Sequence, residues 1–134
     1  MPMDVAIVDP EKELWSGEAR FLVAHTEDGE IGILPGHAPF LGVLKYAWLK
    51  IDTCDETIYF AVHSGFLEVK DSRVSVLARV AELGTAIDVA RAQQARERAE
   101  EALRESDEDV DAQKALLRAE ARLKTAGELG LIVG

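Results

Sequence analysis

The sequence predicts a β-sandwich followed by an antiparallel pair of helices. Up to about Ala81 the chain mixes Val, Ile, Phe, Trp and Tyr with turn residues. Beyond Ala81 it is dominated by Ala, Arg, Glu and Leu, and it contains no Pro, Trp, Tyr or Phe. This change in composition marks a β-rich part and a helical part. We therefore expect a β-sandwich domain over residues 1–84 and a helical hairpin domain over residues 85–134.

Short apolar or alternating runs between turn signals predict the strands of the first part. Asp9-Pro10 and Asp71-Ser72 are two of these signals. Within residues 57–63, Ile58, Phe60 and Val62 would share one face and form core. The expected strands cover residues 3–8, 19–25, 30–35, 43–52, 57–63, 65–69 and 73–78. Regular spacing of this kind is typical of a sandwich or flattened barrel.

The second part reads as two helices joined by a short turn. Thr85 or Asp88 can cap the first helix, Asp109 can cap the second, and Gly127 is expected to end it. The apolar positions have helical spacing, and most of them are alanine: Ala92, Ala95, Ala99, Ala102, Leu103, Ala112, Leu116, Ala119 and Leu123. Because a buried alanine contributes far less than the ~2 kcal/mol of a buried leucine, we expect a marginally stable hairpin that can open.

Charge and cysteine content exclude several classes of protein. Twenty-five acids against fifteen bases give a formal charge of −10, which argues against binding to nucleic acid. The one cysteine, Cys54, cannot form an internal disulfide, and the sequence has no Cys/His cluster with metal-site spacing. No signal-peptide pattern and no apolar run of about 18 residues occurs. We expect a protein that reaches a membrane only through a partner.

The sequence also argues against a catalytic centre. His25, His37, His63 and Cys54 are the obvious candidates for nucleophile or base. No GxSxG, HExxH or GxxxxGK[ST] pattern places any of them beside a partner group. We therefore expect no enzymatic activity from this chain and no bound metal.

Two patterns leave alternatives open. The segment GEIGILPGHAPFLG sets Glu30 and His37 among glycines and prolines, which fits either a strand that turns or a loop that docks a partner. The arginines pair by helical spacing, with Arg91 and Arg98 on the first helix and Arg118 and Arg122 on the second. In a folded hairpin they can converge on a polyphosphate, or they can lie on solvated faces with ion pairs.

Three motifs in order give the chain a family resemblance. GEIGILPGHAPFLG, GFLEV followed by VSVLA, and IDVARA followed by RAEEAL resemble the epsilon subunit of bacterial F-type ATP synthase, which is called delta in mitochondria. The resemblance implies a non-catalytic subunit of the rotor stalk that couples proton flow to ATP synthesis. The implied partners are the gamma subunit, the ring of c subunits and, transiently, the catalytic alpha and beta subunits. It further implies a peripheral location on the cytoplasmic face of the bacterial plasma membrane.

The resemblance also implies functional residues. Asp28, Gly29 and Glu30 would form the turn that meets the c ring, and His37 would lie near gamma. Some family members bind ATP on the hairpin, and the positions of this sequence that match their contacts are Glu82, Ile87, Asp88, Arg91, Ala92, Arg98, Arg118 and Arg122.

Bound ATP would hold the hairpin against the sandwich, and without ATP the hairpin would extend along gamma and block ATP hydrolysis. No cofactor would be required. One departure from the family is Ser64, which precedes Gly65 where a glycine pair is common. The alternative function is a free-standing nucleotide-sensing module, which the same arginines would serve.

Overall fold

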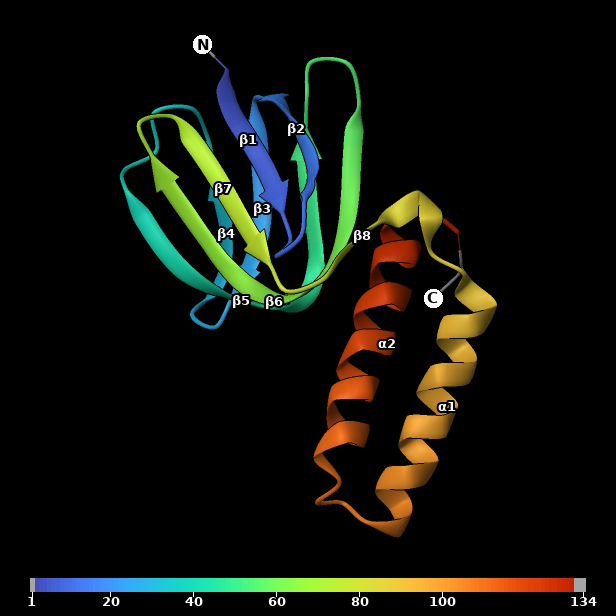
Figure 1. Ribbon diagram of the computed structural model, residues 1–134. Coiled ribbons are helices and arrows are strands. Elements are labelled where there is room, and N and C mark those ends of the chain that lie inside the picture. The colour runs from blue at the N-terminus through green and yellow to red at the C-terminus, as the bar shows by residue number, and fades with distance from the viewer. Residues whose placement is uncertain (1, 132–134) are drawn as a thin grey trace.

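The computed structural model describes residues 2–131 and has the predicted fold class, a β-sandwich followed by two helices. Figure 1 shows the strands in one body and both helices beside its end. The elements are β1 (Met3–Val8), β2 (Glu13–Ala19), β3 (Phe21–Thr26), β4 (Gly29–Ile33), β5 (Phe40–Asp52), β6 (Thr57–Lys70), β7 (Arg73–Ala78), β8 (Ala81–Leu83), the 3₁₀ turn η1 (Gly84–Ala86), α1 (Val89–Glu105) and α2 (Val110–Glu128).

The strands form one hydrogen-bonded sheet that folds over on itself (Figure 1). Its order is β2-β1-β7-β6-β5-β3-β4, and β8 pairs with β6 beside this path. Only β1 and β7 are parallel among the described pairs. The two long strands β5 and β6 have 13 and 14 residues and take part in both layers.

The core lies between the layers. Side chains such as Ile7, Leu22 and Leu49 are fully buried there because alternate residues of each strand point inward. The predicted inward face of β6 is confirmed, since Phe60 and Val62 belong to the core cluster and Ile58 packs against it.

The strand prediction was wrong at three places. β2 and β8 were not predicted, and β6 was predicted as two separate strands. Ser64 has φ 61° and Gly65 has φ 143°, and with these dihedrals the chain turns locally but stays in the ladder with β5 and β7. A Cβ atom at Gly65 would collide with the carbonyl oxygen of Leu77 and lie 2.8 Å from Cα of Ala78. Glycine is therefore required there.

Both helix starts are as predicted, whereas the predicted end of α2 was wrong. Asp88 caps α1 and Asp109 caps α2, each by accepting a hydrogen bond from a backbone N–H three residues later. α2 continues through Gly127, and Gly130 with φ 74° closes it instead. The N–H of Leu131 donates to the carbonyl of Ala126 at 2.9 Å, which is the hydrogen bond of a glycine-terminated helix.

α2 has two buried faces. One packs on α1 through the predicted alanines, of which Ala119 is fully buried. The other packs on β5 and β6 and includes Ala121 and Thr125, with exposed fractions of 1% and 0%. Figure 1 shows that only the end of α2 near β8 meets the sandwich, and the half of the hairpin near the α1–α2 turn stands clear of it.

Candidate functional site

A pocket lies where β8, η1 and the two helices meet. Its volume is about 450 Å³, and its lining residues are Glu82, Ala86, Ile87, Asp88, Arg91, Ala92, Ala95, Arg98 and Arg122. The lining includes every predicted nucleotide contact except Arg118, which lies one turn before Arg122 and outside the pocket. The predicted convergence of arginines from both helices is thus present for Arg91, Arg98 and Arg122.

The start of α1 forms one wall of the pocket. Ile87 is buried and precedes Asp88, whose Oδ1 accepts a hydrogen bond from the N–H of Arg91 at 3.1 Å. The Asp88 carboxylate already occupies the N-terminus of α1 and brings a negative charge there. The positive charge that would attract an anion must therefore come from side chains. Arg91 and Arg98 lie two turns apart on α1 and supply it.

An ion pair joins the sandwich to the hairpin at the edge of the pocket. Arg122 Nε donates to Glu82 Oε1 and Oε2 at 3.0 and 2.9 Å, and Arg122 Nη2 donates to Oε1 at 2.8 Å. Such a forked contact fixes both distance and orientation. The His63 ring and then Arg122 lower the pKa of Glu82 to about 2, despite the opposing effect of burial. Glu82 in turn raises the pKa of Arg122.

His63 also lies at this site, although no sequence motif predicted it there. Its side chain is 2% exposed, and Nε2 lies 3.7 Å from Glu82 Oε1, an ion-pair distance that is too long for a hydrogen bond. Neither ring nitrogen has a hydrogen-bond partner among the described residues. The alternation of β6 could have placed His63 on the outer face, opposite Phe60 and Val62, but no sequence signal showed that α2 would cover that face.

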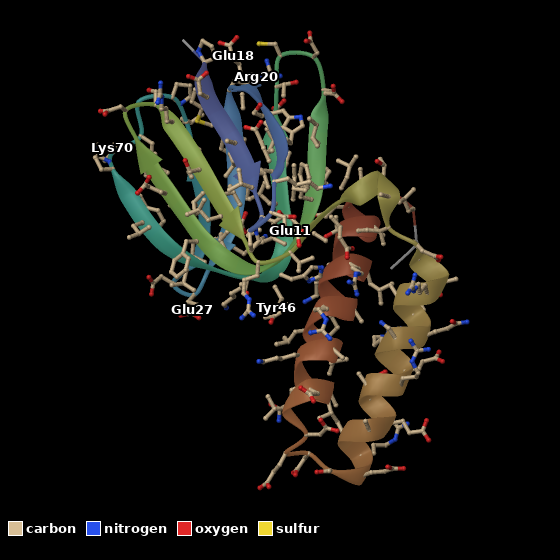
Figure 2. All side chains as sticks on the ribbon, viewed as in Figure 1. Glu11, Glu18, Arg20, Glu27, Tyr46 and Lys70 are labelled. Carbon is tan, nitrogen blue, oxygen red and sulfur yellow. The ribbon has the colours of Figure 1, made fainter. Side chains whose placement is uncertain are left out.

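The predicted c-ring residues form the turn between β3 and β4. Thr26 Oγ1 donates to the carbonyl of Gly29 at 2.9 Å and accepts from the N–H of Asp28 at 3.2 Å. Gly29 has φ 124°, and Asp28 and Glu30 are exposed. Figure 2 shows the neighbouring Glu27 at the same end of the sandwich as Tyr46. The turn is therefore a rigid, acidic and accessible surface.

His37 lies at the other end of β4, in the connection to β5. Its Nδ1 is 2.7 Å from the carbonyl oxygen of Ala38, and its ring meets Phe40 edge to face at 6.4 Å between centroids. The N–H of Gly36 donates to Ser72 Oγ at 3.2 Å, which ties this loop to the β6–β7 turn. The structure thus separates His37 from the Asp28–Glu30 turn instead of joining them in one site.

An apolar row crosses four neighbouring strands on the outside of the sandwich. Val43 of β5 is the cross-strand partner of Phe66 of β6, which is opposite Leu77 of β7, which is opposite Val8 of β1. Phe66 is 51% exposed and Leu77 is 47% exposed. These four residues, named here the apolar row, line a groove of about 510 Å³ with Pro10 and Arg79 at its rim. The apolar row is therefore a candidate contact surface of the sandwich.

Two family models cover nearly the whole chain. Residues 2–84 match the β-sandwich domain of the ATP synthase delta/epsilon chain, and residues 86–127 match its long α-helix domain. The chain belongs to the ATP synthase delta/epsilon family. Members of this family are non-catalytic subunits, so the predicted class of rotor-stalk subunit without a catalytic centre of its own is confirmed.

Relatives of known name support the membership in this family. The ATP synthase epsilon chain of Streptomyces coelicolor is 43% identical over 125 residues, which are 92% of this chain and 94% of that one. The epsilon chain of Desulforamulus reducens is 45% identical over 123 residues, or 90% and 93% of the two chains.

Solved structures agree in fold. A chain of the Euglena gracilis mitochondrial ATP synthase, solved as OSCP/F1/c-ring, superposes with a TM-score of 0.73 at 19% identity and covers 98% of this chain and 82% of its own. ATP synthase is a membrane-associated complex. Between residues 2 and 131, neither helix is long and apolar enough to cross a bilayer.

Proposed function

We propose that ATP binds in the pocket between β8 and the hairpin and holds the hairpin against the sandwich, and that this contact regulates ATP hydrolysis by the synthase. The arrangement of charge supports the proposal. The chain has a net charge of −10, yet three guanidinium groups from two helices line one pocket. A ligand that bridges them joins α1 to α2, so it stabilises the closed helix pair, which is the form that packs on the sandwich.

The ion pair between Glu82 and Arg122 limits how a phosphate group of ATP could bind Arg122 in the pocket. Arg122 already makes three contacts to Glu82, so a phosphate either shares this guanidinium or displaces the carboxylate. Arg91 and Arg98 line the same pocket on the solvent side of α1, and both are exposed. We infer that they make the first contacts to the polyphosphate.

We further propose how the subunit sits in the rotor. The acidic β3–β4 turn with Asp28, Gly29 and Glu30 faces the c ring, and the apolar row with the His37 loop faces gamma. Both surfaces belong to the sandwich, so residues 1–84 act as the docking domain and residues 85–134 as the regulatory domain. The released hairpin reaches the alpha and beta subunits transiently. With these contacts, we propose a peripheral location on the cytoplasmic face of the bacterial plasma membrane.

Calorimetry and thermal unfolding of the isolated chain test the nucleotide site. ATP should raise the melting temperature in a concentration-dependent way. Arg91→Ala should abolish this rise and Arg122→Ala should weaken it, because each lost charged hydrogen bond costs roughly 1.5 to 3 kcal/mol. Arg104→Ala is the matched control, since Arg104 lies in the last turn of the same helix and outside the pocket.

Two further results discriminate between alternatives. Arg118→Ala should have little effect on ATP binding if the site consists of the residues that line the pocket. It should weaken ATP binding strongly if all four arginines predicted from the sequence contact the nucleotide. An absence of binding at millimolar ATP would leave Asp88 as a helix cap and Arg91 as a solvated side chain. A free-standing nucleotide-sensing module would bind ATP but would elute without gamma and c subunits on purification.

A further inference from the structure

Within residues 2–131, one ion pair carries every hydrogen bond between the strands and the two helices. No backbone hydrogen bond of this part of the chain joins a strand to α1 or α2. Arg122 makes three side-chain contacts to the Glu82 carboxylate, at 2.8, 2.9 and 3.0 Å. The attachment of the hairpin therefore depends on this pair and on apolar packing.

The apolar packing of α2 on the sandwich is weak. The buried residues on this side, Ala121 and Thr125, have small side chains, and the free energy of burial scales with the apolar area removed from water. The Thr125 hydroxyl donates to the carbonyl of Ala121 at 2.7 Å, so its hydrogen bond stays within α2. Packing thus leaves a large part of the docking free energy to the ion pair.

Regular structure fixes both partners of the pair. Glu82 lies in β8 opposite Ala61 of β6, and Arg122 lies in the C-terminal half of α2. The side chains of Glu82 and Arg122 are 31% and 27% exposed. Salt screens such a partly buried pair less than a surface pair, and the forked contact fixes its geometry. We therefore expect this pair to stabilise docking more than an exposed ion pair would.

Glu82 keeps its negative charge near neutral pH. The His63 ring, whose Nε2 is 3.7 Å from Glu82 Oε1, and then Arg122 lower the pKa of Glu82 to about 2. The attraction between Glu82 and Arg122 is therefore fully present near neutral pH, and it needs no bound ligand.

We propose that the Glu82–Arg122 pair is a latch that keeps the hairpin docked on the sandwich when no nucleotide is bound. The pair lies at the end of α2 near β8, which is the part of the hairpin that meets the sandwich (Figure 1). An empty pocket then does not release the hairpin, in contrast to the expectation from the family resemblance. This inference goes beyond the proposed nucleotide site, because it holds whether or not ATP binds. Bound ATP would add to a contact that is already present.

A distance measurement on the full chain without nucleotide tests the latch. Cys54 is the single cysteine and is exposed in the β5–β6 turn, and Glu108→Cys adds a second exposed site in the α1–α2 turn. With spin labels on both, pulsed electron resonance gives a narrow distance distribution for a docked hairpin and a broad one for a released hairpin. The labelled chain with no other change should give the narrow distribution.

Removal of either charge should release the hairpin. Glu82→Gln and Arg122→Gln should each raise the ratio of released to docked molecules by roughly tenfold to a hundredfold, the equivalent of one lost charged hydrogen bond. The double variant should release the hairpin no more than the stronger single variant, because both changes remove the same interaction. Arg118→Gln is the matched control, one turn earlier on the same helix and outside the pocket, and it should leave the hairpin docked.

Several results would overturn the inference. A broad distribution in the chain with no other change would show that the pair does not hold the hairpin. Docked hairpins in both single variants would assign docking to packing alone, and additive effects in the double variant would show that Glu82 and Arg122 act through different partners. Release in Arg118→Gln would mean that loss of any positive charge from α2 suffices. Amide exchange in β1 and β7 should stay slow in every variant, and faster exchange there would assign the pair to the stability of the sandwich.

Calorimetry with ATP on the same proteins keeps the two proposals separate. A hairpin that is docked without nucleotide and a chain that binds no ATP at millimolar concentration would support the latch and remove the nucleotide site. ATP binding to a chain whose hairpin is released without nucleotide would do the reverse.

Discussion

At the scale of single residues, a close approach between β6 and β7 decides which substitution the fold tolerates. Ser64 and Gly65 both have positive φ in the middle of β6, and Gly65 leaves no room for a Cβ atom against β7. The GFLEV motif begins with this glycine. Only the pairing of β6 with β7 shows why a glycine is needed there.

Gly65→Ala should destabilise the sandwich by roughly 3 kcal/mol or more, because its Cβ meets backbone atoms of Leu77 and Ala78 that cannot move freely. Gly36→Ala is the control, since Gly36 has φ 84° but has open space around it. It should cost only about 1 kcal/mol from its backbone conformation. Urea unfolding of both variants gives the comparison, and equal losses would show that φ and not the clash sets the cost.

Glu82 predicts a specific dependence of stability on acid pH. Its pKa falls from 4.5 to about 2 in the folded protein, so its contribution is complete above pH 4.5 and disappears as pH falls toward 2. Glu82→Gln should therefore lower the free energy of unfolding near neutral pH by about 1–3 kcal/mol, and the difference from wild type should shrink in acid. Thermal unfolding over this pH range measures it. Glu100→Gln, on the exposed side of α1, should show no such convergence.

At the scale of elements, the sequence predicted what local patterns determine and missed what packing determines. Asp88, one of the two caps expected for α1, and Asp109 of α2 were correct because capping depends on the nearest three residues. β2 was missed because Ser16 and Gly17 interrupt its apolar pattern, and β8 because three residues are too few to show one. Gly127 was misplaced as a terminator because the burial of Ala126 carries α2 past it.

In the candidate site, too, local motifs identified some residues, whereas others are brought together only by packing. Ile87, Asp88, Arg91 and Ala92 of the IDVARA motif were identified from their order along the chain, and all four line the pocket. The pairing of Glu82 with Arg122 joins residues 40 positions apart, and the burial of His63 depends on a helix that starts 47 positions later. No local pattern contains such information.

Gly84 should control how firmly the hairpin docks. A Cβ atom there would lie 2.5 Å from Leu129 Cδ1 and 3.0 Å from the carbonyl oxygen of Tyr59. The Leu129 side chain can rotate away, but the Tyr59 carbonyl is backbone, so Gly84→Ala should shift η1 and modestly speed amide hydrogen exchange in α2 while leaving β1 and β7 protected. Gly127→Ala has open space and should slow that exchange, since alanine is a better helix former by about 1 kcal/mol. Unchanged exchange in Gly84→Ala would contradict a tight contact.

The two domains should differ in independent stability. A chain ending after Thr85 keeps the entire core cluster, so it should remain folded and show a dispersed amide spectrum. The isolated hairpin, with a seam made mostly of alanine, should be largely disordered by circular dichroism. A collapsed or unfolded sandwich fragment would mean that α2 is part of the core.

At the scale of the whole molecule, the docking surfaces should matter for assembly and not for folding. Glu30→Ala and His37→Ala should each change the free energy of unfolding by no more than about 0.5 kcal/mol, because Glu30 is exposed and the half-buried His37 has its side-chain hydrogen-bond contact with the neighbouring Ala38. Both should weaken incorporation into the synthase or coupling of proton flow to synthesis. Glu18→Ala, an exposed acid of β2 (Figure 2), serves as the control in membrane assays. A loss of several kcal/mol in the isolated chain would assign Glu30 or His37 a structural role instead.

The length of the β5–β6 pair bears on where this subunit would bend when it rotates under load. Its register runs from Phe40 opposite Val69 to Asp52 opposite Thr57, so load along these strands is shared by many hydrogen bonds in shear. The connection from β8 through η1 has only six residues of strand and turn. We therefore expect mechanical compliance to be concentrated at this connection, with the sandwich as the stiff member that transmits torque while the hairpin deflects.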